Sequence, residues 1–427
     1  MRAGAAVVDI TPPAGLEMAG YGARQGVSTD TRDPLYARAV VLDDGERRVG
    51  IVCSDLIGVS PRLITHIRER AGEMDLLVAA THTHQGPAFA RGRLDDHGER
   101  CGDLIADAVV AAAGRLEPVT LRAGTATVDS VSQNRRDPDG AIETNVRVLS
   151  LDGADGAVAT IVNYACHPTV LEYDNLRYSA DWVGAAMGTV EAAVGGIALY
   201  LQGCCGDINP VWTAHTFDEA DRIGRIVGSA AARVGCELRA HGRNQRAVNL
   251  SWSEQTPKPP SGALLDEAPL RSAFATVEVA HRDIRSVDDL DAEIADLREQ
   301  LDEANSRELR PRLNAVAMER VLIDRGVVHP GRTETLELQA VRLAQDCVVV
   351  TLPGEFLVAT ARTLEQRCGV EHLLIAGYAN GYCGYVPPAE EFPEGGYEVG
   401  MARFETGAEA KIVDSAVDLV RTVARAN

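Results

Sequence analysis

Short apolar runs alternate with amphipathic stretches along most of the chain. The apolar runs include VRVLSLDG, AVATIVNYA and GIALYLQG, and the stretches CGDLIADAVVAAAGRL and EADRIGRIVGSAAARV have the spacing of amphipathic helices. After about residue 334 the same rhythm returns, with CVVVTLPGEF before a predicted helix in VATARTLEQRC. This pattern is typical of an α/β protein. We predict a mixed β-sheet core flanked by helices, in a single domain that spans residues 1–427.

A charged segment interrupts this pattern at residues 283–325. Ser286 begins the sequence Ser-Val-Asp-Asp, which has the form of a capping box, and Leu290 and Leu297 follow at helical spacing. We predict a helical insertion, which either lies solvated against one side of the sheet or forms a lid over a site. Charged helix faces usually favour the first alternative. The polar, proline-bearing segment 251–262 before it predicts a surface loop.

The charge balance excludes several partners. The 427 residues include 42 Lys and Arg against 62 Asp and Glu, which gives a formal net charge of −20. An acidic protein repels a phosphate backbone and an anionic membrane, so we expect no nucleic-acid partner and no stable membrane association. No window approaches the run of about 18 apolar residues that a membrane helix needs, and the first residues do not resemble a secretory signal. Nine scattered cysteines suit a reducing compartment, so we predict a cytoplasmic protein.

Five apolar runs end abruptly in polar clusters. They are DLLVAATHTHQGP at 75–87, ATIVNYACHPTVL at 159–171, IALYLQGCCGDINP at 197–210, CVVVTLPGEF at 347–356 and HLLIAGYANGYCGYVPP at 372–388. In α/β proteins the ends of strands and the loops after them build the functional site, because the sheet holds the polar groups rigidly. We therefore expect the five clusters to share one site.

The side chains in these clusters are typical metal ligands. His82 and His84 can point to one side of an extended segment, and Pro168 biases His167 toward an extended conformation. Glu355 is expected in the first turn of the helix that follows it. Two imidazoles and a carboxylate are a common first shell for catalytic Zn²⁺. The same residues also fit structural roles, as hydrogen-bonded histidines at strand ends and as a carboxylate that only interacts with a helix N-terminus.

Several motifs together point to a family. They are AAVVDITPPAGLEMAGYG, ATHTHQGP, NYACHPTVL with SADW, QGCCGDINP, PGEF and GYVPPAEEFPEGGYE. They resemble those of the neutral/alkaline, non-lysosomal ceramidases, zinc-dependent amidases that release a fatty acid from an N-acyl sphingoid base. The resemblance implies a Zn²⁺ cofactor bound by His82, His167, Glu355 and Tyr385. It also implies that the substrate carbonyl is lined by His84, Tyr397 and Arg135, for which the neighbouring Arg136 is an alternative.

The chain departs from the family pattern in two places. The family loop reads Gly-Asp-Val-Ser-Pro, whereas this chain has Asn209 at the position of the serine. An amide is no serine-type nucleophile, so we expect metal-activated water to attack, with Asn209 donating a hydrogen bond to substrate or oxyanion. Asp207 in the same loop is either a residue of the site or a turn or cap residue. The chain also stops soon after the tyrosine segment, so we expect a short relative without the family's immunoglobulin-like domain and secretion signal.

These observations predict a zinc-dependent hydrolase of an amide or related acyl bond in a small soluble N-acyl substrate. A true ceramidase is one alternative, although the acidic charge and the aromatic content of 4% argue against a membrane-extracted lipid. A metal-dependent lyase or isomerase on the same scaffold is another, because one fold can host several chemistries. A metal-binding relative without catalysis is the third. The sequence is also compatible with a homo-oligomer.

Overall fold

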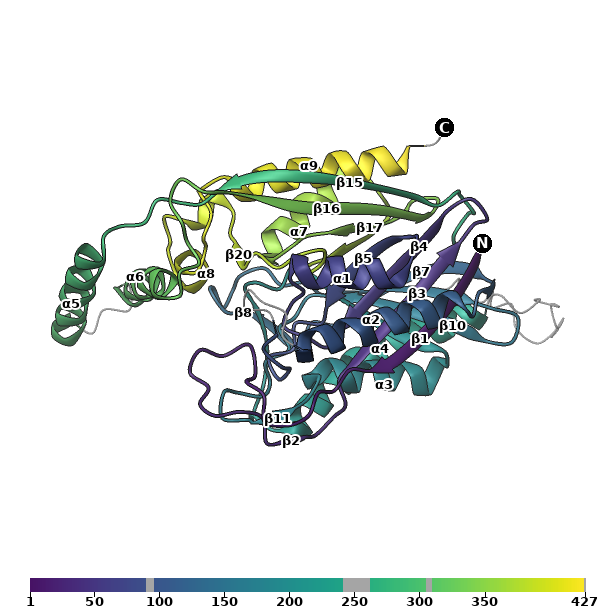
Figure 1. Ribbon diagram of the computed structural model, residues 1–427, viewed down its shortest axis with the longest axis horizontal. Coiled ribbons are helices and arrows are strands. Elements are labelled where there is room, and N and C mark those ends of the chain that lie inside the picture. The colour runs from purple at the N-terminus through teal and green to yellow at the C-terminus, as the bar shows by residue number, and fades with distance from the viewer. Residues whose placement is uncertain (90–95, 241–261, 305–308, 426–427) are drawn as a thin grey trace, which may run out of the picture.

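Three larger sheets form the scaffold of the computed structural model, which describes residues 1–89, 96–240, 262–304 and 309–425. Helices flank these mixed sheets (Figure 1), so the predicted α/β class is confirmed. The surface loop predicted at 251–262 lies outside the described residues except for its last residue. The single domain remains a prediction.

The first sheet has the strand order β5-β4-β3-β1-β6 among the described residues. Its strands are β1 (Arg2–Asp9), β3 (Tyr36–Asp43), β4 (Arg48–Ser54), β5 (Asp75–Ala80) and β6 (Glu117–Pro118). Helix α1 (Pro61–Ala71) connects the parallel strands β4 and β5, and α2 (Asp96–Ala113) packs on β1 and β3. The side chain of Ser60 caps α1 by accepting from the Leu63 N–H at 3.2 Å, and the first residue of the helix is a proline.

The second sheet has the order β12-β10-β9-β7-β14, and three of its strands come from the apolar runs VRVLSLDG, AVATIVNYA and GIALYLQG. Its strands are β7 (Thr120–Thr127), β9 (Asn145–Asp152), β10 (Ala157–Tyr164), β12 (Ile197–Gln202) and β14 (Gly262–Leu264). Helices α3 (Asp181–Val194) and α4 (Phe217–Ala240) pack tightly against each other. Gly224 permits this approach, because a Cβ there would lie 2.3 Å from the carbonyl oxygen of Trp182.

The third sheet has the order β15-β16-β17-β19. Its strands are β15 (Arg271–Ala280), β16 (Thr333–Ala344), β17 (Cys347–Thr351) and β19 (His372–Ala376). Helix α7 (Val358–Cys368) coincides with the predicted helix VATARTLEQRC, and α9 (Ala408–Ala424) packs along β15, β16 and β17. Side chains from all three sheets share one buried cluster, which includes Ile51, Ile161, Leu201 and Val349. This common core fixes the ends of strands from different sheets relative to one another.

Three two-stranded pairs hold the loops beside these strand ends. They are β2 (Asp30–Thr31) with β11 (Arg177–Tyr178), β8 (Ser132–Asn134) with β13 (Ile208–Pro210), and β18 (Glu355–Phe356) with β20 (Tyr385–Val386). A 3-10 turn, η1 (Ala389–Glu391), and the short helix α8 (Tyr397–Gly400) follow the last pair. Within the described ranges, no helix is both long enough and apolar enough to cross a membrane.

The helical insertion projects from one end of the molecule (Figure 1) and consists of α5 (Val287–Ala304) and α6 (Leu309–Asp324). The predicted cap is present, because Ser286 Oγ accepts from the Asp289 N–H at 3.1 Å. Helix α6 packs on α8. The contact is close at Gly400, where a Cβ would lie 2.7 Å from the Cβ of Met318. The insertion therefore supports the short helix that carries Tyr397.

Candidate metal centre

The loops after β5, β10, β12, β17 and β19 meet at one place, as the five polar clusters predicted. Backbone hydrogen bonds tie these loops together: Ala80 N–H to Tyr378 O (3.1 Å), Gly203 N–H to Tyr164 O (2.9 Å) and Gly206 N–H to Phe356 O (2.9 Å). Two of the strand pairs involved, β10 with β12 and β17 with β19, are parallel. Parallel neighbours deliver their carboxyl ends to the same edge of a sheet, which is where α/β proteins build sites.

His82 and His167 turn the same ring nitrogen toward this meeting point. Nδ1 of His82 lies 2.7 Å from the carbonyl oxygen of Ile57, and Nδ1 of His167 lies 3.2 Å from that of Ile208. A carbonyl oxygen only accepts, so both Nδ1 atoms carry hydrogen and Nε2 is the atom presented to a ligand. Metal-binding histidines commonly have this arrangement, in which a backbone carbonyl fixes the ring.

Glu355 completes a three-atom group with the two imidazoles. Its Oε2 lies 3.6 Å from His82 Nε2 and 3.5 Å from His167 Nε2. Glu355 Oε2 and His167 Nε2 are buried and have no hydrogen-bond partner among the described residues. Ligands about 2.0–2.2 Å from a tetrahedral Zn²⁺ lie about 3.3 Å from one another. The separations and the unpartnered atoms therefore both fit one shared cation.

The pKa values of these groups show how the site is charged without a metal. Burial lowers the pKa of His82 to about 4. Burial also acts to lower the pKa of His167, but Cys205 and Glu355 outweigh it and raise that pKa to about 9. For Glu355, burial acts to raise the pKa, but His82 and His167 outweigh it and hold the pKa at about 2. A proton on His167 thus supplies the positive charge beside the Glu355 carboxylate, and a bound cation would release it.

His84 lies beside the three-atom group and offers a second ligand set. Its Nε2 is 3.1 Å from His82 Nε2, and ligand atoms of His82, His84 and His167 all lie within 4.8 Å of one another. Burial and the two neighbouring imidazoles hold the pKa of His84 well below its usual range, so the ring is neutral. The resemblance placed this ring at the substrate carbonyl, and the geometry is compatible with either position.

The prediction that Glu355 lies in the first turn of a helix is wrong. Glu355 belongs to β18, and α7 begins at Val358. Asp207 caps the N-terminus of α7, because its Oδ1 accepts a hydrogen bond from the Val358 N–H at 2.8 Å. The other oxygen of Asp207 accepts from Asn134 Nδ2 at 2.9 Å. This geometry favours the cap role for Asp207. The Glu355 carboxylate does not cap the helix and instead faces the imidazoles of His82 and His167.

Replacing Asp207 with alanine tests this cap role. It would leave the buried N–H of Val358 without an acceptor, which is expected to lower the free energy of unfolding by about 1–3 kcal/mol. Chemical denaturation measures the change, with the exposed Asp418→Ala on α9 as the control. An Asp207→Ala protein of unchanged stability would contradict the cap role.

Arg135 follows β8 and gathers three of the other predicted residues. Its Nη2 donates to the Tyr385 hydroxyl at 2.9 Å and its Nη1 to Asn209 Oδ1 at 3.3 Å. Its guanidinium carbon also lies 5.4 Å from the ring centroid of Tyr397. Register places Tyr385 beside Glu355 in the β18–β20 pair. The side chain of Arg135 therefore links the tyrosine strand to the Asn209 loop.

Glu398 is a buried residue of this network that the sequence interpretation missed. Its Oε1 accepts from Arg135 Nε and its Oε2 from Arg136 Nη1, both at 2.7 Å. Arg136 also reaches Glu391 and the carbonyl oxygen of Gly395, away from the contacts that Arg135 makes. The geometry therefore favours Arg135 over Arg136 at the site. The one available signal for Glu398 was its place directly after Tyr397.

The SADW motif holds the loop that carries His167. Trp182 Nε1 donates to the carbonyl oxygen of His167 at 3.0 Å. The Asp181 carboxylate accepts from the N–H groups of Val170 and Leu171 at 3.2 and 3.0 Å. The motif thus fixes the backbone on both sides of the turn that follows the histidine.

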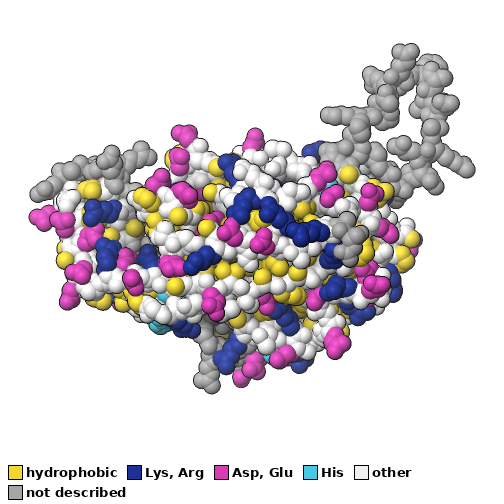
Figure 2. Space-filling view, turned by 90° about the horizontal axis from the view of Figure 1, so that it is seen from above, with side chains coloured by type: hydrophobic (Ala, Val, Ile, Leu, Met, Phe, Trp, Pro, Cys, Tyr) yellow, Lys and Arg dark blue, Asp and Glu magenta, His cyan; other side chains and the backbone are white. Residues whose placement is uncertain are grey.

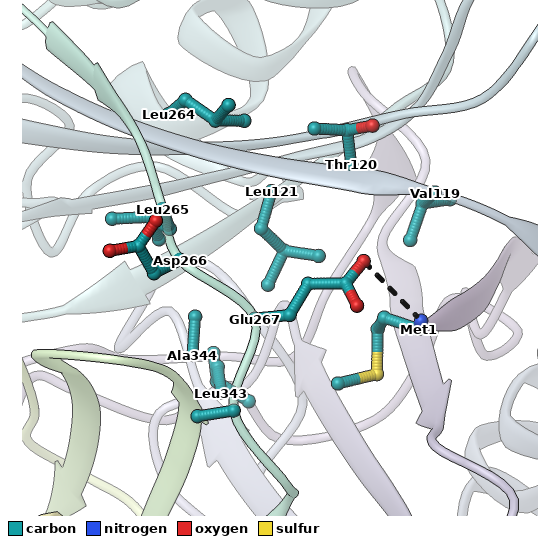
Figure 3. A pocket seen from close by; sticks show the side chains of 11 residues that line it. Met1, Val119, Thr120, Leu121, Leu264, Leu265, Asp266, Glu267, Leu343 and Ala344 are labelled. Carbon is teal, nitrogen blue, oxygen red and sulfur yellow. Dashed lines mark ion pairs between the residues drawn. The ribbon is translucent and has the colours of Figure 1, made fainter.

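A pocket of about 230 Å³ lies at a different place (Figure 3) and contains none of the candidate residues. It is lined by Met1, Val119–Leu121, Leu264–Ala268, Leu343 and Ala344. The amino group of Met1 lies 4.0 Å from Glu267 across it. Strands β7 and β10 are both antiparallel to β9, so they run in the same direction. The pocket lies at the beginning of β7, whereas His167 follows the end of β10. The pocket is therefore at the opposite end of the second sheet from His167.

The comparisons with known proteins agree with one another. The family described as "Neutral/alkaline non-lysosomal ceramidase, N-terminal" matches residues 1–212. The chain is 24% identical to the neutral ceramidase of Pseudomonas aeruginosa over 98% of this chain and 71% of that protein. It is 23% identical to the neutral ceramidase of Mycobacterium tuberculosis over 95% of this chain and 74% of that protein.

Solved structures show the same fold. The crystal structure of the neutral ceramidase from Pseudomonas aeruginosa matches with a TM-score of 0.74 at 21% identity, over 99% of this chain and 74% of that chain. A structure described as "Ceramidase complexed with C2" matches with a TM-score of 0.71 at 21% identity, over 99% of this chain and 75% of that chain.

Proposed function

Because this chain belongs to the neutral/alkaline non-lysosomal ceramidase family, we propose that it is a zinc-dependent hydrolase of the amide bond in a small soluble N-acyl substrate. The observation that carries the proposal is the convergence of His82 Nε2, His167 Nε2 and Glu355 Oε2. Two of these atoms, His167 Nε2 and Glu355 Oε2, are buried and have no hydrogen-bond partner in the part of the chain that the structure describes. Buried polar atoms without partners are costly, so their presence argues for a ligand.

The residues present fit a divalent cation held by His82, His167 and Glu355, with Tyr385 as the fourth ligand that the family resemblance implies. A Zn²⁺ ion bound there would supply Lewis-acid activation of water and of the scissile carbonyl. The protein's part is to hold the carboxylate and the two rings in place, which the Ile57 and Ile208 carbonyls do for the imidazoles.

Donors around the centre would stabilise negative charge on the substrate carbonyl. Arg135 is held by Glu398 and Tyr385 and keeps its positive charge, because both partners outweigh the burial that acts to lower its pKa. Asn209 accepts from Arg135 through Oδ1, so its Nδ2 is the end left to donate to an oxyanion. Tyr397 is 43% exposed and lies at the rim, where a substrate can reach it.

The charge and the surface of the protein support a soluble substrate. The net charge is −20, and on the face in Figure 2 apolar side chains lie scattered between charged ones. Such a surface repels an anionic bilayer. The names of the relatives favour N-acylsphingosine as the second candidate substrate.

Hydrolysis in ¹⁸O-labelled water tests the proposal. With Zn²⁺-loaded protein and a panel of short N-acyl amines beside a long-chain ceramide, we expect ¹⁸O in the released carboxylic acid and faster turnover of the soluble substrates. Mass spectrometry of the acid measures the label. Ceramide as the preferred substrate would contradict the substrate class, and a product without ¹⁸O would contradict hydrolysis in favour of a lyase or isomerase.

A further inference from the structure

Tyr382 lies in a loop whose backbone is held in an unusual conformation. Asn380 has φ of 56°, in the left-handed region that few side chains adopt. Its buried side chain anchors the loop, because Oδ1 accepts from the Val78 N–H at 3.0 Å and Nδ2 donates to Gln339 Oε1 at 2.9 Å. The loop is therefore docked on β5, the strand that leads to His82.

The hydroxyl of Tyr382 contacts one oxygen of Glu355 and leaves the other free. It donates to Oε1 at 2.5 Å, whereas Oε2 faces the two imidazole Nε2 atoms and has no hydrogen-bond partner within the described ranges. The phenol is the donor here, because an ionised carboxylate can only accept a hydrogen bond. The two carboxylate oxygens are therefore inequivalent before any metal binds.

Neighbouring residues restrict the ring of Tyr382. A Cβ on Gly58 would lie 2.8 Å from its Cγ, so a larger residue at position 58 would press on the ring. The ring lies nearly parallel to that of Tyr378, with centroids 6.3 Å apart and an interplanar angle of 21°. Tyr378 in turn stacks on His82 at 4.0 Å. Two rings of the same loop thus contact candidate ligands: Tyr378 stacks on His82, and Tyr382 holds Glu355.

We propose that Tyr382 is a positioning residue that fixes the orientation in which the Glu355 carboxylate presents one oxygen to the metal. The inference rests on the proposed function, because it presupposes a cation at Glu355. Without the hydroxyl, the carboxylate is free to rotate about its Cγ–Cδ bond away from the orientation that points one oxygen at the imidazoles, so ordering it would cost part of the binding free energy. Outer partners of metal ligands typically contribute about 10–100-fold to metal affinity.

Tyr382→Phe removes the hydroxyl and keeps the ring. The Zn²⁺ dissociation constant, measured against a competing fluorescent chelator without substrate, is expected to rise about 10–100-fold. The matched control is Tyr164→Phe, which removes another buried hydroxyl, the one that donates to Ser132 Oγ at 3.0 Å. The control is expected to bind Zn²⁺ as the unchanged protein does.

A second variant reaches the same hydroxyl from another loop. Gly58→Ala would displace the Tyr382 ring and is expected to weaken Zn²⁺ binding in the same direction, which decides the matter if Tyr382→Phe does not fold. Unchanged Zn²⁺ affinity in a folded Tyr382→Phe protein would overturn the inference and leave the proposed function standing. If the protein without any substitution binds no Zn²⁺, both the proposed function and this inference are overturned.

Discussion

His167→Ala is expected to abolish metal binding and hydrolysis together, with a loss in kcat/KM of at least about 1,000-fold. The substitution removes one of the three atoms that converge on the shared position. Lewis-acid activation supplies several kcal/mol to the reaction, and each 1.4 kcal/mol corresponds to about tenfold in rate. Zinc content by elemental analysis and kcat/KM should be measured on the same sample, so that the two losses can be compared directly.

The matched control for this variant is His66→Ala. His66 is a partly buried histidine on α1 whose Nε2 lies 2.8 Å from Asp103 Oδ1, and it is no part of the cluster around His82. It should keep full zinc content and full activity. A His167→Ala protein that retains one zinc per chain, or that keeps its activity after losing zinc, would contradict the metal account.

Arg135→Lys is expected to lower kcat/KM by about 100- to 1,000-fold while zinc content stays unchanged. A lysine ammonium cannot reproduce the planar fork that now reaches Glu398, Tyr385 and Asn209 together. The loss should fall mainly on kcat, because the guanidinium is placed to act on charge that develops in the transition state.

Arg136→Lys provides the matched control, since the neighbouring guanidinium binds the same Glu398 but turns to Glu391 and Gly395. We expect a much smaller effect there. Equal losses in the two variants would indicate that both arginines act only through the position of Glu398, and the catalytic role of Arg135 would then be withdrawn.

The local sequence pattern predicted much of the scaffold. The apolar runs VRVLSLDG, AVATIVNYA and GIALYLQG form strands β9, β10 and β12, and VATARTLEQRC is helix α7 from Val358 to Cys368. These elements were predictable because their apolar periodicity reflects burial on the core face. The ends of five strands carry the polar clusters for the same reason, since polar side chains collect where the buried run stops.

Long-range contacts were not predictable from that pattern. Glu355 precedes a helix in sequence, but the Val358 N–H is satisfied by Asp207, 151 residues away. The roles suggested for Tyr382 and Glu398 depend on partners that only the packing of separate sheets brings within hydrogen-bond distance. The packing of α6 on α8 likewise depends on close approach at Gly400, which no local signal encodes.

Anomalous diffraction at the zinc absorption edge, from crystals grown with Zn²⁺, tests the central claim most directly. We predict one strong peak about 2.0–2.2 Å from His82 Nε2, His167 Nε2 and Glu355 Oε2. The absence of a peak, or a peak bound by His82, His84 and His167 with Glu355 outside bonding distance, would contradict the account.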